Sequence, residues 1–312
     1  MILNEFYHHF LTVANQVLIL FLLVSLGYIC GKKKIISETA AEGFSSIALY
    51  FSTPAAIICS FIRPFEKAKL TNLGFAFLIS IVFHLVAIGF SFLIKQKTQD
   101  EEKVSRFALI FSNAGFMAIP LQLALFSADG AFYGSAYVVI FNVMIWTVGL
   151  AIMGGKLTLK KLLLNPGTIG VCIGLIIFLS NIHQVLPSSA TTTAQHIANL
   201  NTPVPMIVIG YYLSKLDLVK AIVDKRIYFP LFLRLVVCPA ICILLLWLVK
   251  MDSEVAVPLI VAAACPVAAS TTMFTVKFSR DVDLSVKLVS VTTLFSIITL
   301  PLCVALTQVL LN

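Results

Sequence analysis

The stretch ALIFSNAGFMAIPLQLALFSA, residues 108–128, decides the fold of this chain. It is long and apolar enough to cross a membrane, yet polar or helix-breaking residues interrupt it at Ser112, Asn113 and Pro120. A second interrupted stretch, VPLIVAAACPVAASTTMFTV, covers residues 257–276. Because lipid offers no partners to freed backbone groups, a broken membrane helix survives only where protein surrounds it or where it lines a polar cavity. Two such helices in one chain are typical of a transporter, and the breaks predict its binding site.

Composition also places the chain among multi-pass membrane proteins. Of its 312 residues, 60% are hydrophobic and only 12% are charged, and the mean hydropathy is +1.02. Such a chain has its apolar surface solvated by lipid. Apolar runs of about 20 residues predict ten transmembrane helices. They cover residues 12–31, 43–62, 73–94, 107–128, 131–153, 166–184, 199–214, 228–249, 256–276 and 286–310.

Positive charge is distributed unevenly between the predicted loops. When these loops are assigned alternately to two sides, one side receives 17 of the 22 basic residues, and Arg234 lies inside a span. The positive-inside rule therefore predicts that both termini lie on the non-cytoplasmic side of an inner or plasma membrane. The net charge of +8 belongs to loops that face anionic lipid, so the bilayer is the expected partner and nucleic acid is not.

The predicted spans divide into two halves of five. The first half covers residues 1–153 and the second covers residues 166–312, and a short basic linker at 154–165 is expected in the cytoplasm. An odd number of spans per half forces the halves to insert with opposite topology, which is the inverted-repeat arrangement of many secondary transporters.

Two landmarks recur in register between the halves. A Thr-Pro pair begins at Thr53 in the second span and at Thr202 in the seventh, 149 residues later. A proline interrupts the fourth span at Pro120 and the ninth at Pro266, 146 residues later. These similar offsets support the predicted repeat.

Five short segments, spread over the whole chain, carry a resemblance to a known family. They are SNAGFMAIPL at 112–121, FNVMIW at 141–146, Asn165-Pro166 with IGL at 173–175, ACP at 264–266 and FTVKF at 274–278. With these segments the chain resembles the auxin efflux carrier family, and the stretch from Asn113 to Pro120 is the most specific part of the resemblance.

The resemblance implies an all-α membrane protein of ten helices in a 5+5 inverted repeat. Helices four and nine are then broken and cross at their prolines, beside a substrate site shared between a mobile transport domain and a scaffold domain. The plant members have a long loop between the halves, which is absent here. Compact bacterial members are associated with malate, malonate and related carboxylates, so auxin itself is not implied. A homodimer is suggested by the resemblance alone.

The distribution of carboxylates also favours an anionic substrate. All 14 lie in loops or at the ends of predicted spans, so the midplane has no acid to balance a bound cation. A half-helix that begins after a break instead presents unpaired N–H groups and the positive end of its dipole, which suits an anion. The seven cysteines form no C-x-x-C pair and no histidine has metal spacing, so we expect no metal site and no cofactor.

We predict ten substrate-binding residues around the breaks. Each has an alternative role. An Asn or Thr can hydrogen-bond backbone groups that a nearby break leaves without partners, and a lone membrane Asn can hydrogen-bond a neighbouring helix. A hydroxyl group can cap a helix, and a proline can simply kink one. The ten are Thr53, Asn113, Gly115, Pro120, Asn142, Asn201, Thr202, Pro266, Ser270 and Thr271.

Two ionisable residues inside spans lie outside this set. Arg234 lies eight residues after Arg226, about 12 Å deeper along a helix, and we expect it to extend back toward the cytoplasmic interface. His84 in the third span either carries a proton or hydrogen-bonds a neighbouring helix.

These observations predict a secondary transporter, with efflux favoured, that moves a small organic anion by alternating access. No G-x-x-x-x-G-K loop for a nucleotide is present, and none of the five histidines has a catalytic context, so we expect no enzyme. The alternative is a sodium- or proton-coupled symporter of the bile-acid type, and sodium-independent transport would exclude its sodium-coupled form.

Overall fold

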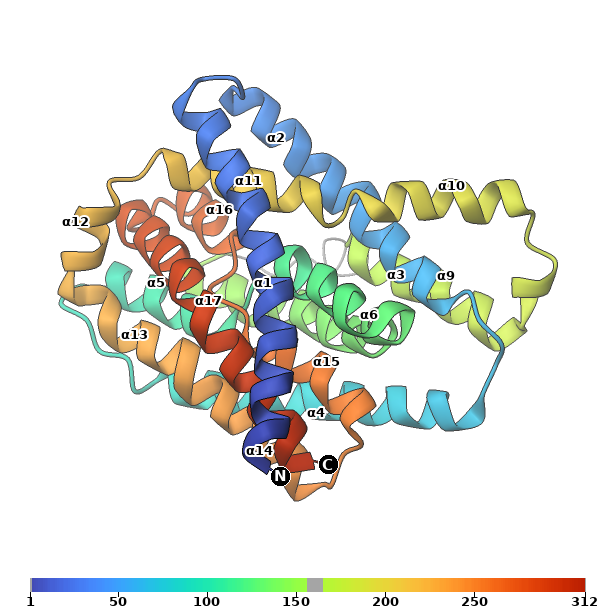
Figure 1. Ribbon diagram of the computed structural model, residues 1–312. Helices are drawn as coiled ribbons and strands as arrows, with labels where there is room; N and C mark the ends of the chain where they lie inside the picture. Colours follow the sequence, from blue (N-terminus) through green and yellow to red (C-terminus); the bar gives the residue numbers. More distant parts are fainter. Residues whose placement is uncertain (1, 156–164, 312) are drawn as a thin grey trace.

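The computed structural model describes residues 2–155 and 165–311, and within these ranges the regular elements are helices, with one isolated β-bridge (Figure 1). The predicted all-α fold class is therefore confirmed. The first half contains α1 (Ile2–Lys32), α2 (Glu38–Ile47), α3 (Thr53–Phe61), α4 (Lys67–Ser91), α5 (Gln99–Ile110), α6 (Ile119–Met144) and α7 (Leu150–Met153). The second contains α9 (Pro166–Ser180), α10 (Ser188–Asn199), α11 (Pro203–Ser214), α12 (Leu218–Val223), α13 (Tyr228–Phe232), α14 (Cys238–Leu248), α15 (Ser253–Ala264), α16 (Ser270–Lys277) and α17 (Val282–Leu311).

Helix fills most of each predicted span, but fewer stretches are long enough to cross a membrane by themselves. Among the described residues, six continuous helical stretches are sufficiently long and apolar, while α9 and α15 are apolar but shorter. The chain is thus a multi-pass membrane protein, and the ten-span inverted repeat stays a prediction. The six stretches are Glu5–Lys32, Glu38–Phe61, Lys67–Ser91, Ala114–Met153, Lys225–Leu248 and Val282–Leu311.

The longest stretch, Ala114–Met153, folds back on itself. Its backbone leaves the helical region at Phe126 (φ −132°, ψ 15°) and Ser127 (φ 51°, ψ −137°). The two arms touch beside this turn, because a Cβ added to Gly130 would lie only 2.2 Å from the carbonyl oxygen of Gln122. Glycine permits this approach because it has no side chain. The turn therefore divides the stretch into two arms, close to the boundary predicted between the fourth and fifth spans.

Three π-helical turns each end two residues before a proline. A proline ring collides with the carbonyl group four residues earlier and offers no N–H, which normally breaks a helix. The wider π turn relieves this collision, so the helix continues through the proline. The turns are η1 (Ala48–Ser52) before Pro54, η2 (Ala114–Ala118) before Pro120 and η6 (Leu233–Val237) before Pro239.

This arrangement corrects the predicted break at Pro120. Pro120 lies in the first turn of α6, which continues directly from η2. The actual interruption is at Phe111–Asn113, between α5 and η2. In the second half the interruption covers Cys265–Ala269 and includes Pro266, as predicted.

The helices pack in several sets that are connected to one another. α1 packs most extensively against α11, where a Cβ on Gly27 would lie 2.1 Å from Ile207 O and one on Gly210 would lie 1.9 Å from Val24 O. α3 packs against α6, α9 and α10. α6 also packs against α4 and α15, and α15 packs against α17. α1 also contacts α17, which runs in the opposite direction (Figure 1).

An ion-pair network around Arg226 ties together the ends of α5, α13 and α17. The guanidinium donates to Glu101 (3.1 Å), Asp224 (2.7 Å), Asp281 (3.0 Å) and Asp283 (3.1 Å). The hydrogen bond from Arg226 holds the pKa of Asp224 well below its usual range. For Glu101, burial by itself raises the pKa, but the hydrogen bonds from Arg226 and from the Thr98 backbone bring it below its usual value. This network lies at the end of the molecule that the charge distribution predicts to be cytoplasmic.

Candidate functional site

The two interruptions lie against each other and are joined by their main chains. The N–H of Asn113 donates to the carbonyl oxygen of Pro266 (2.8 Å), and the N–H of Ala268 donates to that of Phe111 (2.9 Å). These bonds form an isolated antiparallel bridge between Ser112 and Val267. We call this contact, residues 111–113 with 265–269, the junction. It satisfies buried backbone groups that the broken helices cannot satisfy internally.

Local sequence explains where each helix stops at the junction. Cys265 precedes Pro266, and the residue before a proline is disfavoured in the helical region. Accordingly, Cys265 is extended (φ −57°, ψ 150°) and α15 ends at Ala264. The helix α5 begins with a capping box formed by Thr98 and Glu101 and ends where Phe111 becomes extended (φ −102°, ψ 107°).

A buried arginine joins the carboxyl ends of the two half-helices at the junction. Arg234 is fully buried, and its Nη1 donates to the carbonyl oxygen of Leu109 near the end of α5 (2.9 Å). Its Nη2 donates to that of Ala263 near the end of α15. A cation is favourable at a helix carboxyl end, which carries partial negative charge. The expectation that Arg234 extends to the cytoplasmic interface is therefore wrong, because its guanidinium is held inside the protein by two helix ends.

The other side of the junction offers polar groups that lack partners. Asn113 is only 5% exposed and precedes η2 without capping it through its side chain. The hydroxyl oxygens of Ser270 and Thr271, in the first turn of α16, are buried and form no hydrogen bond within the described structure. Gly115 faces open space, since a Cβ there would have no neighbour within 4 Å. Polar groups left unpaired in a protein interior are costly, so their presence points to a ligand or to water.

A further polar cluster includes Ser112. Its hydroxyl is 3.1 Å from the hydroxyl of Tyr137, and the ring of His84 packs 4.8 Å from the ring of Tyr137, measured between centroids. His84 is fully buried and its Nδ1 donates to the carbonyl oxygen of Ser80 (2.7 Å). This bond lies within α4 itself, so Nδ1 does not form the predicted hydrogen bond to a neighbouring helix, and Nε2 has no partner within the described structure.

The recurring Thr-Pro pairs of the two halves also lie close together, because Thr53 bonds to Asn201, the residue before Thr202. Thr53 Oγ1 donates to Asn201 Oδ1 (2.7 Å), and both side chains are buried. Asn201 Nδ2 has no partner within the described structure. This pair lies where α3 and η1 pack against α10.

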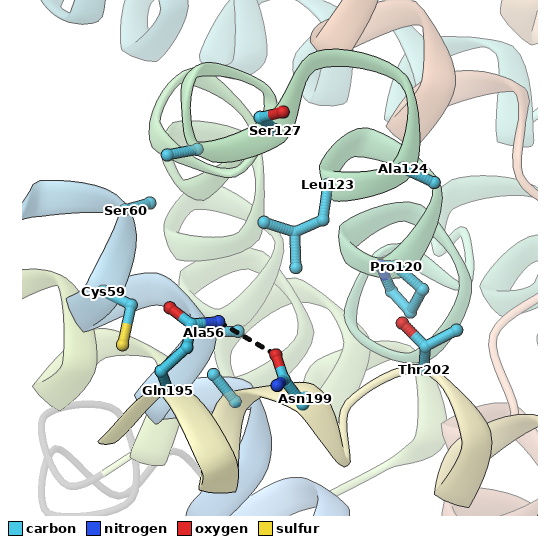
Figure 2. A pocket seen from close by; sticks show the side chains of 12 residues that line it. Ala56, Cys59, Ser60, Pro120, Leu123, Ala124, Ser127, Gln195, Asn199 and Thr202 are labelled. Carbon is cyan, nitrogen blue, oxygen red and sulfur yellow. Dashed lines mark hydrogen bonds between the residues drawn. The ribbon is translucent and has the colours of Figure 1, made fainter. Parts of the chain in front are cut away.

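A cavity of about 460 Å³ lies between α3, α6, α10 and the start of α11. Figure 2 shows Pro120, Leu123 and Ala124 of α6 on one wall, with Gln195 and Asn199 of α10 facing them. Gln195 Nε2 donates to Asn199 Oδ1 (2.9 Å). The polar lining residues are Ser60, Ser127, Gln195, Asn199 and Thr202.

The ten predicted site residues therefore do not form one cluster. Asn113, Pro266, Ser270 and Thr271 gather at or beside the junction, and Gly115 follows it in η2. Pro120 and Thr202 line the cavity, and Thr53 and Asn201 bond to each other. Asn142 lies beside Gly167 at the start of α9, where a Cβ on Gly167 would be 2.8 Å from Asn142 Nδ2. Asn142 therefore lies at a contact between α6 and α9, and its role in substrate binding stays a prediction.

Sequence reasoning missed the cavity residues of α10. Gln195 and Asn199 lie four positions apart and therefore share one face of α10. This helix is short and polar, and the predicted span began only at residue 199. The polar residues just before the predicted span at 199–214 were the signal that could have pointed to these cavity residues.

Comparison with known proteins agrees with these structural features. The family described as membrane transport protein matches residues 12–158 and 155–304. The chain is also 25% identical, over 300 residues, to an uncharacterized transporter of Methanocaldococcus jannaschii, and the alignment covers 92% of this chain and 96% of that protein. The chain therefore belongs to the membrane transport protein family, which is the auxin efflux carrier type of transporter.

Proposed function

We propose that this protein is a secondary transporter that carries a small organic anion, such as a carboxylate, by alternating access around the junction. Membership of the transporter family supports the general activity. The observation that carries the anionic substrate is the set of buried donors without partners at the junction, together with buried Arg234. A cation site would need a buried acid, and the 14 carboxylates of the chain lie outside the middle of the predicted spans.

In this proposal Asn113, Ser270 and Thr271 bind the substrate carboxylate. The amide of Asn113 and the two hydroxyl groups donate to its oxygens, and the amino end of α16 contributes the positive end of its dipole. One helix end contributes about 0.3–1 kcal/mol when exposed and up to about 2 kcal/mol when partly buried. These contributions suit moderate affinity, which a transporter needs in order to release its substrate.

The predicted membrane orientation sets a preferred direction. With the cytoplasm negative, moving one negative charge outward is favourable by about 2.3 kcal/mol per 100 mV. An anion carrier with no coupling ion therefore runs as an exporter. A proton- or sodium-coupled symporter would instead show uptake that depends on the pH gradient or on sodium.

Counterflow in proteoliposomes tests the proposal. Vesicles loaded with malonate should accumulate radiolabelled malonate, without sodium, and malonamide should not compete because it lacks charge. Asn113→Ala should reduce the rate at least tenfold, since it removes a donor from the site. The matched control is Asn15→Ala, because Asn15 is exposed on α1 and far from the junction in sequence. Equal rates for both variants, or accumulation only with sodium, would contradict the proposal.

A further inference from the structure

Two cations and one carboxylate form a compact cluster at the rim of the cavity. Arg63 pairs with Asp129, and Lys69 Nζ lies 3.1 Å from the same Asp129 oxygen. The Arg63 guanidinium also stacks over the ring of Phe132, 4.8 Å from its centroid, and its Nε donates to the carbonyl oxygen of Ser60 (2.8 Å). Three independent contacts thus hold Arg63 in one place, although it follows the end of α3.

The cluster lies directly beside the cavity lining. Ser60, whose carbonyl oxygen accepts from Arg63, lines the cavity, and so do Ser127 and Ala128, which immediately precede Asp129. In Figure 2, Ser60 and Ser127 lie at the same end of the cavity, away from Pro120 and Thr202. The cluster therefore marks one mouth of the cavity.

The charges of this mouth do not cancel. Two cations share one carboxylate, so the cluster has a net charge of about +1 at neutral pH. Arg63 and Asp129 have side-chain exposures of 12% and 36%, so the cluster is partly shielded from water and from salt. A charge beside a cleft with low-dielectric walls concentrates its field in the cleft and attracts ions of opposite sign.

We propose that Arg63 and Lys69 form an anion-attracting lip at the predicted non-cytoplasmic mouth of the cavity, which binds a carboxylate as it passes between the cavity and the outside. Asp129 limits the strength of this lip by competing for the same cations. This inference rests on the proposed function and extends it to a second binding point for the same substrate class. Arg63 has guanidinium N–H groups in a planar fork, which matches a carboxylate. Partial neutralisation by Asp129 keeps the substrate from being trapped at the mouth.

Native Cys59 allows the lip to be tested without any substrate. Cys59 lines the cavity, and Figure 2 shows its sulfur atom among the lining side chains. The purified protein is treated with an anionic sulfonatoethyl or a cationic trimethylammonioethyl methanethiosulfonate, and modification of the Cys59 peptide is followed by mass spectrometry. The ratio of the two rates reports the local potential, because any change in thiol ionisation affects both reagents equally.

The two partners of the ion pair should change this ratio in opposite directions. Arg63→Gln should lower the anionic-to-cationic ratio about fourfold, which is the effect of one unit charge at a distance on the order of 10 Å in water. Asp129→Asn should raise it by a similar factor, and Arg63→Lys should leave it close to that of the wild type. Lys69→Gln tests the same potential if Arg63→Gln does not fold. Cys30, in the last turn of α1, serves as the internal control and should show no change.

Several results would overturn the inference. A ratio that is unchanged in both variants, or shifted the same way in both, would show that the pair only joins α3 to α6. In counterflow, the KM for malonate should rise in Arg63→Gln and fall in Asp129→Asn, and an unaltered KM would show that the potential does not act on the transported anion. If the wild type moves no malonate, the proposed function fails for this probe, while the Cys59 ratio still decides whether the lip attracts anions.

Discussion

Replacement of Arg234 by methionine tests whether one buried guanidinium holds the ends of two half-helices. Methionine is apolar and of comparable length, but it offers no donor to the carbonyl oxygens of Leu109 and Ala263. A hydrogen bond from a charged donor contributes about 1.5–3 kcal/mol, so losing two corresponds to about 3–6 kcal/mol. Removing the charge also removes the cost of burying it, which offsets part of this loss. We expect a net decrease of about 2–4 kcal/mol in the free energy of unfolding.

Thermal unfolding of the purified protein in detergent measures this decrease. At about 2–4 °C per kcal/mol, the Tm of Arg234→Met should fall by about 4–16 °C. Arg234→Lys keeps the charge but lacks the planar fork that reaches both carbonyl groups, so its Tm should be intermediate. The control is Arg106→Met, because Arg106 is partly exposed and pairs with Glu102, and such pairs contribute at most about 1 kcal/mol. If Arg234→Met and Arg106→Met show the same Tm, the reasoning about the helix ends is refuted.

Two further predictions concern packing and pH. Gly27→Ala should lower the Tm by several degrees, because its methyl group would lie 2.1 Å from Ile207 O. Gly43→Ala is the control and should keep or raise the Tm, because a Cβ there has no neighbour within 4 Å. Equal Tm values for the two variants would contradict the close α1–α11 contact. The lowered pKa values of Asp224 and Glu101 mean that their contribution to stability is present above a pH of about 4 and is lost as the pH falls below it. Arg226→Gln should therefore lower the Tm at pH 7 and flatten its dependence on pH between 3 and 7, and a parallel profile would argue against the network.

The sequence was sufficient for the helical class and for identifying the two interrupted stretches. Composition and hydropathy predicted helices in the right places. The register between the halves brought attention to the Thr-Pro pairs that begin at Thr53 and Thr202, and in the structure Thr53 bonds to Asn201, the residue before Thr202. It was also sufficient to identify Asn113 and Pro266, which are joined by a hydrogen bond across 153 residues of chain. These features depend on local polarity and backbone chemistry, which a single sequence contains.

Other features depend on contacts that no local pattern contains. The break was predicted at Pro120 because a proline normally interrupts a helix, but the π turn before it accommodates the ring. Arg234 was expected at the interface because a membrane arginine usually extends to water, and its acceptors, Leu109 and Ala263, come from distant parts of the chain. The cavity likewise depends on where the polar helix α10 packs, which the sequence does not specify.

The π turn between Asn113 and Pro120 also sets a rotational phase. A π turn contains one residue more than an α turn, so deleting one residue from Ala114–Ala118 would leave a regular α-helix. Each residue turns an α-helix by about 100°, so the deletion would rotate Asn113 by that angle about the axis of α6. Its amide would then face a different neighbour although no chemical group near it had changed. The number of residues in this segment, as much as their identity, decides which way the proposed site faces.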